Sequence, residues 1–190
     1  MPDPVTEQKA IAATLSGDPY AFAWLVQQYK HMVHTICFRI LKNTEEAEEA
    51  SQDSFVKAYQ HLDRFQGTSR FSTWLYSIAY RTAISQLRKH GTPTVPLEQV
   101  MVHEPGPTSD QGLERDDRRI ALNKAMDRLP PEDAALISLF YLNELSVEEI
   151  VTVTGSSASN VKVKLHRLRK RLLELLQDEL KEEAWTLIEN

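Results

Sequence analysis

The sequence of 190 residues has little of several features that mark particular classes of protein. It contains a single cysteine, Cys37, so no disulfide can form within the chain, which favours a reducing compartment. It has no apolar run long enough to cross a membrane, and its first residues lack the basic start and apolar core of a signal peptide. We therefore expect a cytoplasmic protein that is not inserted into a membrane.

Catalytic motifs are missing as well. The sequence has no glycine loop that would cradle a phosphate, no nucleophile elbow and no pair of catalytic carboxylates. His31, His34 and Cys37 follow one another at steps of three, which brings neighbours together on a helix, but no fourth metal ligand is evident. We interpret these three as partly buried helix residues, and we expect no enzyme activity, no metal and no cofactor.

Positive charge is scarce overall but concentrated in one segment. The chain holds 22 Lys and Arg against 27 Asp and Glu, a net charge of -5, which argues against indiscriminate adhesion to nucleic acid. Residues 159–171, SNVKVKLHRLRKR, nevertheless contain six basic side chains and no acid. The segment is either a local site for a polyanion or a solvated charged face.

One break in composition divides the chain. Residues 91–113 hold four of the nine prolines and three of the six glycines, which is typical of a linker. Both flanking pieces show helical spacing of apolar residues and no run of alternating strand residues. The predicted fold class is all-α: two small helical domains, at 7–90 and 114–176, joined by a flexible linker, with an acidic tail at 177–190.

The first piece predicts three long helices. The first, over 21–42, has an apolar stripe formed by Phe22, Leu25, Val26, Tyr29, Val33, Ile36 and Ile40. The second begins with a cap at Asn43 or Thr44, and its predicted buried stripe is Phe55, Val56, Tyr59 and Leu62. The third, over 70–89, is predicted to place Phe71, Trp74, Leu75 and Ile78 in the core.

The second piece predicts four helices that end in a helix-turn-helix. Pro131 suits the first turn of the second of them, and Ser146 with Glu149 forms a capping box for a short helix that stops at Gly155. Ser157 is a suitable cap for the final basic helix. Its apolar face is Val161, Leu165, Leu168 and Leu172, and the residues predicted to read a DNA major groove are Asn160, Lys162, Val163, Lys164, His166 and Arg167.

Two long segments resemble one protein family. EEAEEASQDSFVKAYQHLDRFQGTSRFSTWLYSIAYRTAISQLRK is similar to the first-domain signature of the extracytoplasmic-function branch of bacterial RNA polymerase sigma factors. LPPEDAALISLFYLNELSVEEIVTVTGSSASNVKVKLHRLRKRL resembles the promoter-binding C-terminal domain of that family. The resemblance covers about residues 7–90 and 114–176, in the order that the family has.

The resemblance implies a transcription initiation factor that binds core RNA polymerase and promoter DNA. By position, it implies contacts with the clamp helices of the largest polymerase subunit by Glu49, Gln52, Asp53 and Lys57, with a subunit flap as a further contact. For the minus-ten element it implies Thr68, Ser69, Arg70, Tyr76, Tyr80 and Arg81, although an aromatic stripe at helical spacing is equally typical of core for the two tyrosines. The final helix would read the minus-thirty-five element.

The resemblance also implies an anti-sigma factor as a partner. Two domains on a Pro/Gly-rich linker need no fixed mutual arrangement, so an inhibitor could clamp them together over the acidic face around Asp53 and the basic helix around Lys164. The free chain could close through the same two faces, with a weak, screened attraction. Two alternatives are a helix-turn-helix regulator with a sensing or dimerising first domain, and an enzyme with a DNA-binding appendage.

Overall fold

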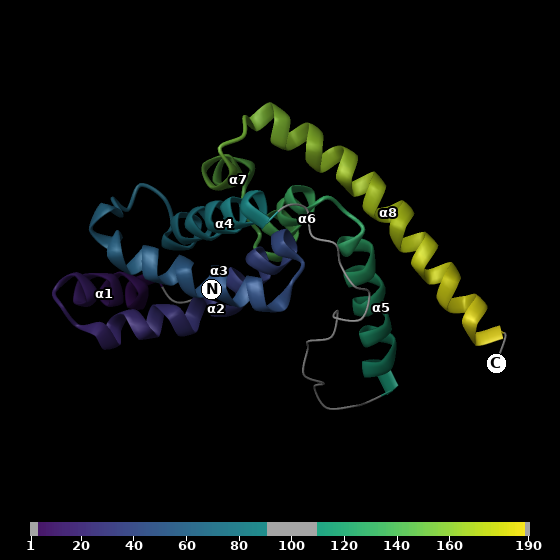
Figure 1. The fold of residues 1–190 in the computed structure, drawn as a ribbon, viewed down its shortest axis with the longest axis horizontal. Coiled ribbons are helices and arrows are strands. Elements are labelled where there is room, and N and C mark those ends of the chain that lie inside the picture. The colour runs from purple at the N-terminus through teal and green to yellow at the C-terminus, as the bar shows by residue number, and fades with distance from the viewer. Residues whose placement is uncertain (1–3, 91–109, 189–190) are drawn as a thin grey trace.

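The chain is described here by a computed structural model, which places the backbone of residues 4–90 and 110–188 and the side chains of residues 5–89 and 118–180. Within these ranges every regular element is a helix, as predicted (Figure 1). Most of the predicted linker, residues 91–109, lies outside the described residues.

The first domain contains α1 (Pro4–Leu15), α2 (Pro19–Leu41), α3 (Thr44–Gln60), a 3-10 turn (Leu62–Arg64) and α4 (Phe71–His90). The carboxylate of Asp18 accepts a hydrogen bond from the Tyr20 amide and caps α2, and Asn43 caps α3 by accepting from the Glu46 amide at 3.0 Å. Helix α1 was not predicted from the sequence.

Small side chains, rather than the largest apolar ones, decide which face of α3 is buried. Its packing face is formed by Ala47, Ala50, Ser51, Ser54, Phe55 and Ala58. These small residues allow α3 to approach α2 and α4 closely. With this face turned inward, Val56 and Tyr59 lie on the outer side of the helix, where they are 53% and 49% exposed. The prediction that Val56 and Tyr59 belong to the buried stripe is therefore wrong, whereas Phe55 and Leu62 are buried as expected.

The second domain contains α5 (Asp110–Asp127), α6 (Pro131–Ile137), a π-helical segment η2 (Ser138–Leu142), α7 (Val147–Thr154) and α8 (Ala158–Ile188). Helix α5 begins inside the segment predicted as linker, and α8 continues through the predicted tail. Leu175 and Glu179 of α8 are buried, and Glu179 accepts a hydrogen bond from Arg128 at 3.1 Å. The side chains of the tail residues Trp185, Leu187 and Ile188 lie outside those described.

The predicted signals of the helix-turn-helix are confirmed in detail. Ser146 and Glu149 form the reciprocal capping box at the start of α7. Gly155 ends α7 with a φ of 73°, a left-handed conformation that glycine adopts without a steric penalty. The Ser157 hydroxyl then accepts from the Asn160 amide and caps α8.

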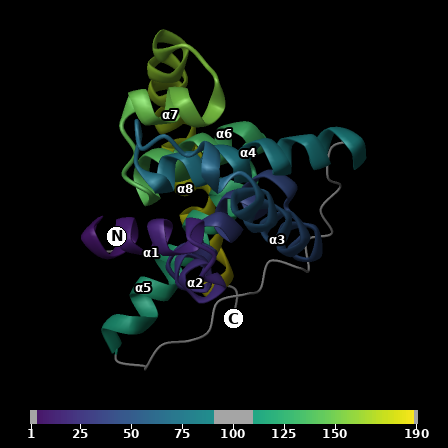
Figure 2. The ribbon, with the colours of Figure 1, turned by 90° about the vertical axis from the view of Figure 1, so that its left-hand side faces the viewer.

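The two domains pack on each other. Helix α7 lies along α4, and α6 packs against α2, so that one hydrophobic core runs through both domains (Figures 1 and 2). Helix α8 extends away from this body with α5 beside it (Figure 1). The expectation that closure would use the acidic α3 face and the basic α8 helix is wrong: the contacts form through α4, α7, α2 and α6, where apolar surface is available.

Candidate nucleic-acid interface

The basic helix α8 is seated by its apolar face and leaves its polar face open. Val161, Leu165 and Leu168 are each less than 9% exposed, which anchors the helix on the rest of the second domain. The predicted readers Asn160, Lys162, Val163, His166 and Arg167 are all exposed. The geometry thus offers one accessible helical face with cations on it, which is the form that enters a major groove.

Three cations of the basic run contact other side chains of the protein: Lys164, Arg169 and Arg171, the last 3.3 Å from the Glu174 carboxylate. Lys164 is half-buried, and its ammonium lies 3.1 Å from the Asp133 carboxylate of α6. Arg169 donates from Nε to the Tyr141 hydroxyl at 2.8 Å, and its guanidinium lies 5.9 Å from the centre of the Tyr141 ring, a cation–π distance. The sequence did not reveal the Tyr141 contact, because it joins elements that are distant along the chain.

A second accessible face lies on α3. Glu49, Gln52, Asp53 and Lys57 are all exposed on it, together with Val56. Gln86 of α4 donates to Glu49 at 3.3 Å, and Lys57 donates to the Thr82 hydroxyl at 3.1 Å. The structure therefore brings together the four predicted polymerase-contacting residues around an exposed apolar side chain.

The loop before α4, residues 65–70, is packed against the core at its base and exposed at its tip. Phe65 packs edge-on against Phe71, with 5.6 Å between ring centres, and in a tilted arrangement against Trp74, with 5.4 Å between ring centres. At the tip Gly67 has a φ of 69°, which a side chain would disfavour. Thr68 and Arg70 are exposed and Ser69 is half-buried, so these three predicted minus-ten residues form one small polar surface.

Tyr76 does not belong to that surface. It is 3% exposed and packs edge-on against Tyr29 at 6.3 Å, and burial, followed by the nearby Glu7 charge, raises its pKa to about 12. The prediction that Tyr76 contacts DNA is therefore wrong, because the helix turns this position into the core. Tyr80 is half-buried, and burial likewise raises its pKa to about 12.

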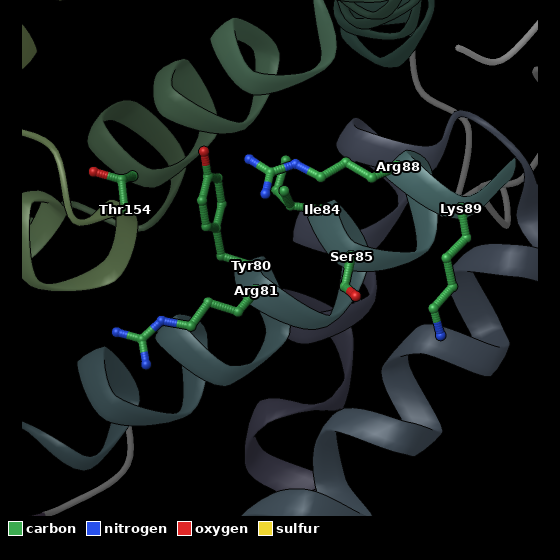
Figure 3. Close-up of a pocket in the computed structure, with 7 residues that line it drawn as sticks. All are labelled: Tyr80, Arg81, Ile84, Ser85, Arg88, Lys89 and Thr154. Carbon is green, nitrogen blue, oxygen red and sulfur yellow. The ribbon is translucent and has the colours of Figure 1, made fainter. Parts of the chain in front are cut away.

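An open hollow of about 410 Å³ lies where the end of α7 meets α4 (Figure 3). Its lining is Tyr80, Arg81, Ile84, Ser85, Arg88, Lys89 and Thr154. Figure 3 shows Arg88 reaching toward Tyr80, whereas Arg81 and Lys89 point away to opposite sides. Because the cations spread along α4 rather than converge, the arrangement suits an extended polyanion better than a single small anion.

His31 is exposed and Cys37 is fully buried, so the interpretation as partly buried helix residues is right only for His34. His34 stacks on Phe38 at 6.3 Å, and burial lowers its pKa. Cys37 is fully buried, and no group of three metal-ligating side chains occurs among residues 5–89 and 118–180. In the helices that the structure describes, none is long and apolar enough to span a bilayer.

Comparison with known proteins accounts for both domains. Residues 25–92 match the family model for sigma-70 region 2, and residues 119–172 match that for sigma-70 region 4. The ECF RNA polymerase sigma factor SigW of Bacillus subtilis is 32% identical over 182 residues, covering 90% of this chain and 97% of that protein. The RNA polymerase sigma-H factor of Pseudomonas aeruginosa is 28% identical, covering 93% and 96%.

A solved structure gives the same assignment. The sigma factor RpoE in complex with the anti-sigma factor NepR, from Bartonella quintana, is 26% identical and superposes with a TM-score of 0.65, covering 82% of this chain and 96% of that one. Regions 2 and 4 in this order define the class of the bacterial RNA polymerase sigma factors. Within that class, this chain belongs to the extracytoplasmic-function (ECF) family.

Proposed function

We propose that this chain directs core RNA polymerase to a specific set of promoters as a dissociable, non-catalytic subunit. The single observation that carries the proposal is the order of the two family matches, region 2 over 25–92 and region 4 over 119–172, with an exposed basic helix in the second. A regulator with a sensing first domain is not favoured, since region 2 accounts for the first domain.

The proposal gives each of the two domains its own binding role. Residues 7–90 bind polymerase and open the minus-ten element, and residues 114–176 bind the minus-thirty-five element, with 177–190 as an extension of α8. The exposed carboxylates of α3 are suited to charge-assisted bonds with cations of the polymerase clamp helices. On the promoter side, the polar loop at Thr68–Arg70 is suited to hold a base that has left the stack.

An anti-sigma factor is proposed as a further partner, with the cytoplasm as the place of action. The support is that a structural relative was solved as a complex of a sigma factor with an anti-sigma factor. Both α3 and α8 keep exposed functional faces in this structure, so an inhibitor has two surfaces to cover.

The deciding experiment is transcription in vitro with core polymerase and fragmented genomic DNA. Initiation at specific sites, mapped by sequencing the RNA 5′ ends, is expected only when this chain is added. Palindromic operator binding without polymerase, and no initiation, would instead support the regulator.

The polymerase surface is tested by reversing charge at Glu49 and Asp53. Changing both to Lys is expected to abolish the complex with core polymerase, because two attractive contacts become repulsive, while the helical circular dichroism stays normal. Asp63→Lys is the matched control, an exposed acid of the same domain outside α3. Unchanged binding of the double variant would refute this assignment of the surface.

A further inference from the structure

The cations of the basic run on α8 differ in whether a carboxylate neutralises them. Lys164 and Arg171 each lie within ion-pair distance of an acid, Asp133 and Glu174 respectively. Among residues 5–89 and 118–180, no acid lies that close to the remaining cations of the run, which are Lys162, Arg167, Arg169 and Lys170. A DNA backbone that approaches α8 therefore meets some cations at full charge and others that are already paired.

The pair of Lys164 with Asp133 is better shielded from water than the pair of Arg171 with Glu174. The side chains of Lys164 and Asp133 are 41% and 22% exposed and their charged atoms lie 3.1 Å apart. The values for Arg171 and Glu174 are 57%, 47% and 3.3 Å. Because water and salt weaken exposed ion pairs most, Asp133 neutralises its cation more effectively than Glu174 does.

Asp133 is also held in place independently of α8. It lies in the first turn of α6, and the four residues that follow it, Ala134–Ile137, are all buried. Glu174, by contrast, is three positions from Arg171 on the same helix, and both side chains are exposed. The carboxylate of Asp133 is therefore a fixed feature beside the basic helix, presented to it by another element.

Lys164 lies where its ammonium has a choice between this carboxylate and DNA. It follows the buried Val161 by three positions and precedes the buried Leu168 by four, so it borders the apolar face of α8. Arg167 lies one turn further on and is exposed. A lysine carries its charge on a flexible four-carbon stem, so an ammonium released from Asp133 can turn outward to a phosphate.

We propose that Asp133 is a specificity-determining residue, which withholds the Lys164 ammonium from the phosphates of non-promoter DNA. The proposal rests on the proposed function, in which α8 reads the minus-thirty-five element. Non-specific binding depends essentially on phosphate contacts alone, so each unpaired cation strengthens it. On a promoter, base contacts by other residues of α8 fix the register, and Lys164 stays with Asp133.

This arrangement favours promoters through what it removes from competing sites. Non-promoter sequence is in vast excess, so the ratio of the two affinities matters more than either affinity alone. A carboxylate that cancels one mobile cation lowers the affinity for every other sequence and leaves the base-reading side chains untouched. Specificity gained by weakening the wrong complex is a general device of recognition.

The test is the variant Asp133→Asn in the full chain, which keeps the size of the side chain and removes its charge. Fluorescence anisotropy on a scrambled duplex over a salt series gives the affinity and its salt slope. With one more phosphate contact available, the affinity at low salt is expected to rise by about 3-fold to 10-fold, and the slope to steepen by about 0.9. Loss of a merely structural contact would not strengthen binding.

Two further variants show whether Lys164 causes the gain. Glu132→Gln is the matched control, since it removes the same charge from the neighbouring position, and Glu132 is exposed with no ion pair among the residues that the structure describes. Its salt slope should stay that of the wild type. Adding Lys164→Gln to Asp133→Asn should abolish the gain. An equal gain in Glu132→Gln, or a gain that persists without Lys164, would overturn the proposal.

A second measurement does not depend on how Asp133→Asn folds. In the otherwise native chain, Lys164→Gln is expected to leave the salt slope on the scrambled duplex almost unchanged, because that cation is already neutralised. Lys162→Gln, at an exposed position of the same helix, is expected to reduce the slope by about 0.9. Equal reductions in the two variants would show that Asp133 does not withhold Lys164.

Selectivity is measured by repeating the titrations on a mapped minus-thirty-five duplex. The ratio of promoter to scrambled affinity is expected to fall in Asp133→Asn, by about the 3-fold to 10-fold gained on scrambled DNA. An equal gain on both duplexes would overturn the role in specificity. A wild type that binds both duplexes equally would contradict the proposed function instead, whereas the effect of Asp133 on scrambled DNA stays measurable. No binding of DNA by any variant would refute both.

Discussion

Lys164 and Arg167 lie on the same helix but have different surroundings. Lys164 is tied to Asp133, whereas Arg167 is exposed on the outward face of α8. A side chain that is already paired must break its pair, or share its charge, to contact DNA. The structure therefore leaves Arg167 more accessible than Lys164 to a DNA ligand, a distinction that their equal charge hides in the sequence.

Replacing Arg167 by Ala is expected to weaken binding to a minus-thirty-five duplex by about 1–3 kcal/mol, if its guanidinium makes a bidentate base contact. Lys164→Ala is expected to have the smaller effect on selectivity. Fluorescence anisotropy on the promoter and on a scrambled duplex, over a salt series, separates the two roles. An equal loss on both duplexes with a reduced salt slope would assign Arg167 to phosphate alone.

We expect the thiol of Cys37 to be unreactive in the native protein. Burial raises the pKa of its thiol to about 12, against a smaller opposing effect from a hydrogen bond with Ser54, so almost no thiolate exists at neutral pH. An aromatic disulfide reagent is expected to react at once in guanidinium chloride and far more slowly without it. Ser85→Cys, at an exposed position of α4, provides the fast control. Rapid labelling of native Cys37 would contradict the packing of α2 against α3.

At the scale of the element, the capping box on α7 links local structure to the contact between domains. Desolvation works to raise the pKa of Glu149, but the hydrogen bonds from Ser146 and Thr73 and the charge of Arg70 together lower it below the ordinary 4.5. A carboxylate with a lowered pKa in the folded state contributes stability that is present above 4.5 and is lost as the pH falls through the lowered value.

Comparison with Glu149→Gln isolates this contribution, because glutamine can also close a capping box. The wild type is expected to unfold at a higher urea concentration than the variant at pH 7, and the difference should shrink steadily below pH 4.5. Urea midpoints measured from pH 7 to pH 3 provide the test. A difference that grows as the pH falls would mean that Glu149 is better bound when protonated.

At the scale of the whole molecule, the shared core predicts joint unfolding of the two domains. Leu129 is 2% exposed in a hydrophobic cluster that runs from α2 to α8. We expect circular dichroism, which reports all helices, and tryptophan fluorescence, to which Trp24 and Trp74 of the first domain contribute, to change at the same urea concentration. Separate transitions would show that the domains unfold independently.

Leu129→Ala is expected to lower the free energy of unfolding by about 2–5 kcal/mol and to shift both signals together. Leu180→Ala is the control: this side chain is 49% exposed, so its loss should change stability by less than about 0.5 kcal/mol. A large loss of stability in Leu180→Ala with none in Leu129→Ala would show that Leu129 does not belong to the core that holds the two domains together.

Local chemistry explains what the sequence by itself determined. The caps at Asn43, Ser146 and Ser157, the stop at Gly155 and the apolar face of α8 depend on residues within one or two turns of each other. Such signals act through hydrogen bonds and backbone angles of neighbouring residues, so they can be found without the fold. The order of two long motifs likewise identified the family, since it requires only sequence.

Which faces of the helices pack against each other was decided only by the tertiary structure. Tyr76, predicted to contact DNA, lies in the core, and Val56, predicted to be buried, lies at the surface. The reason is that the approach of the helices depends on small residues such as Ala50 and not on hydrophobicity alone. The pairing of Arg39 with Asp127 spans 88 positions and includes a buried cation that helical spacing would assign to no partner. Burial makes such a contact depend on an exact partner, because two charges that lose their hydration must find each other, and burial is a property of the assembled domains rather than of any one segment.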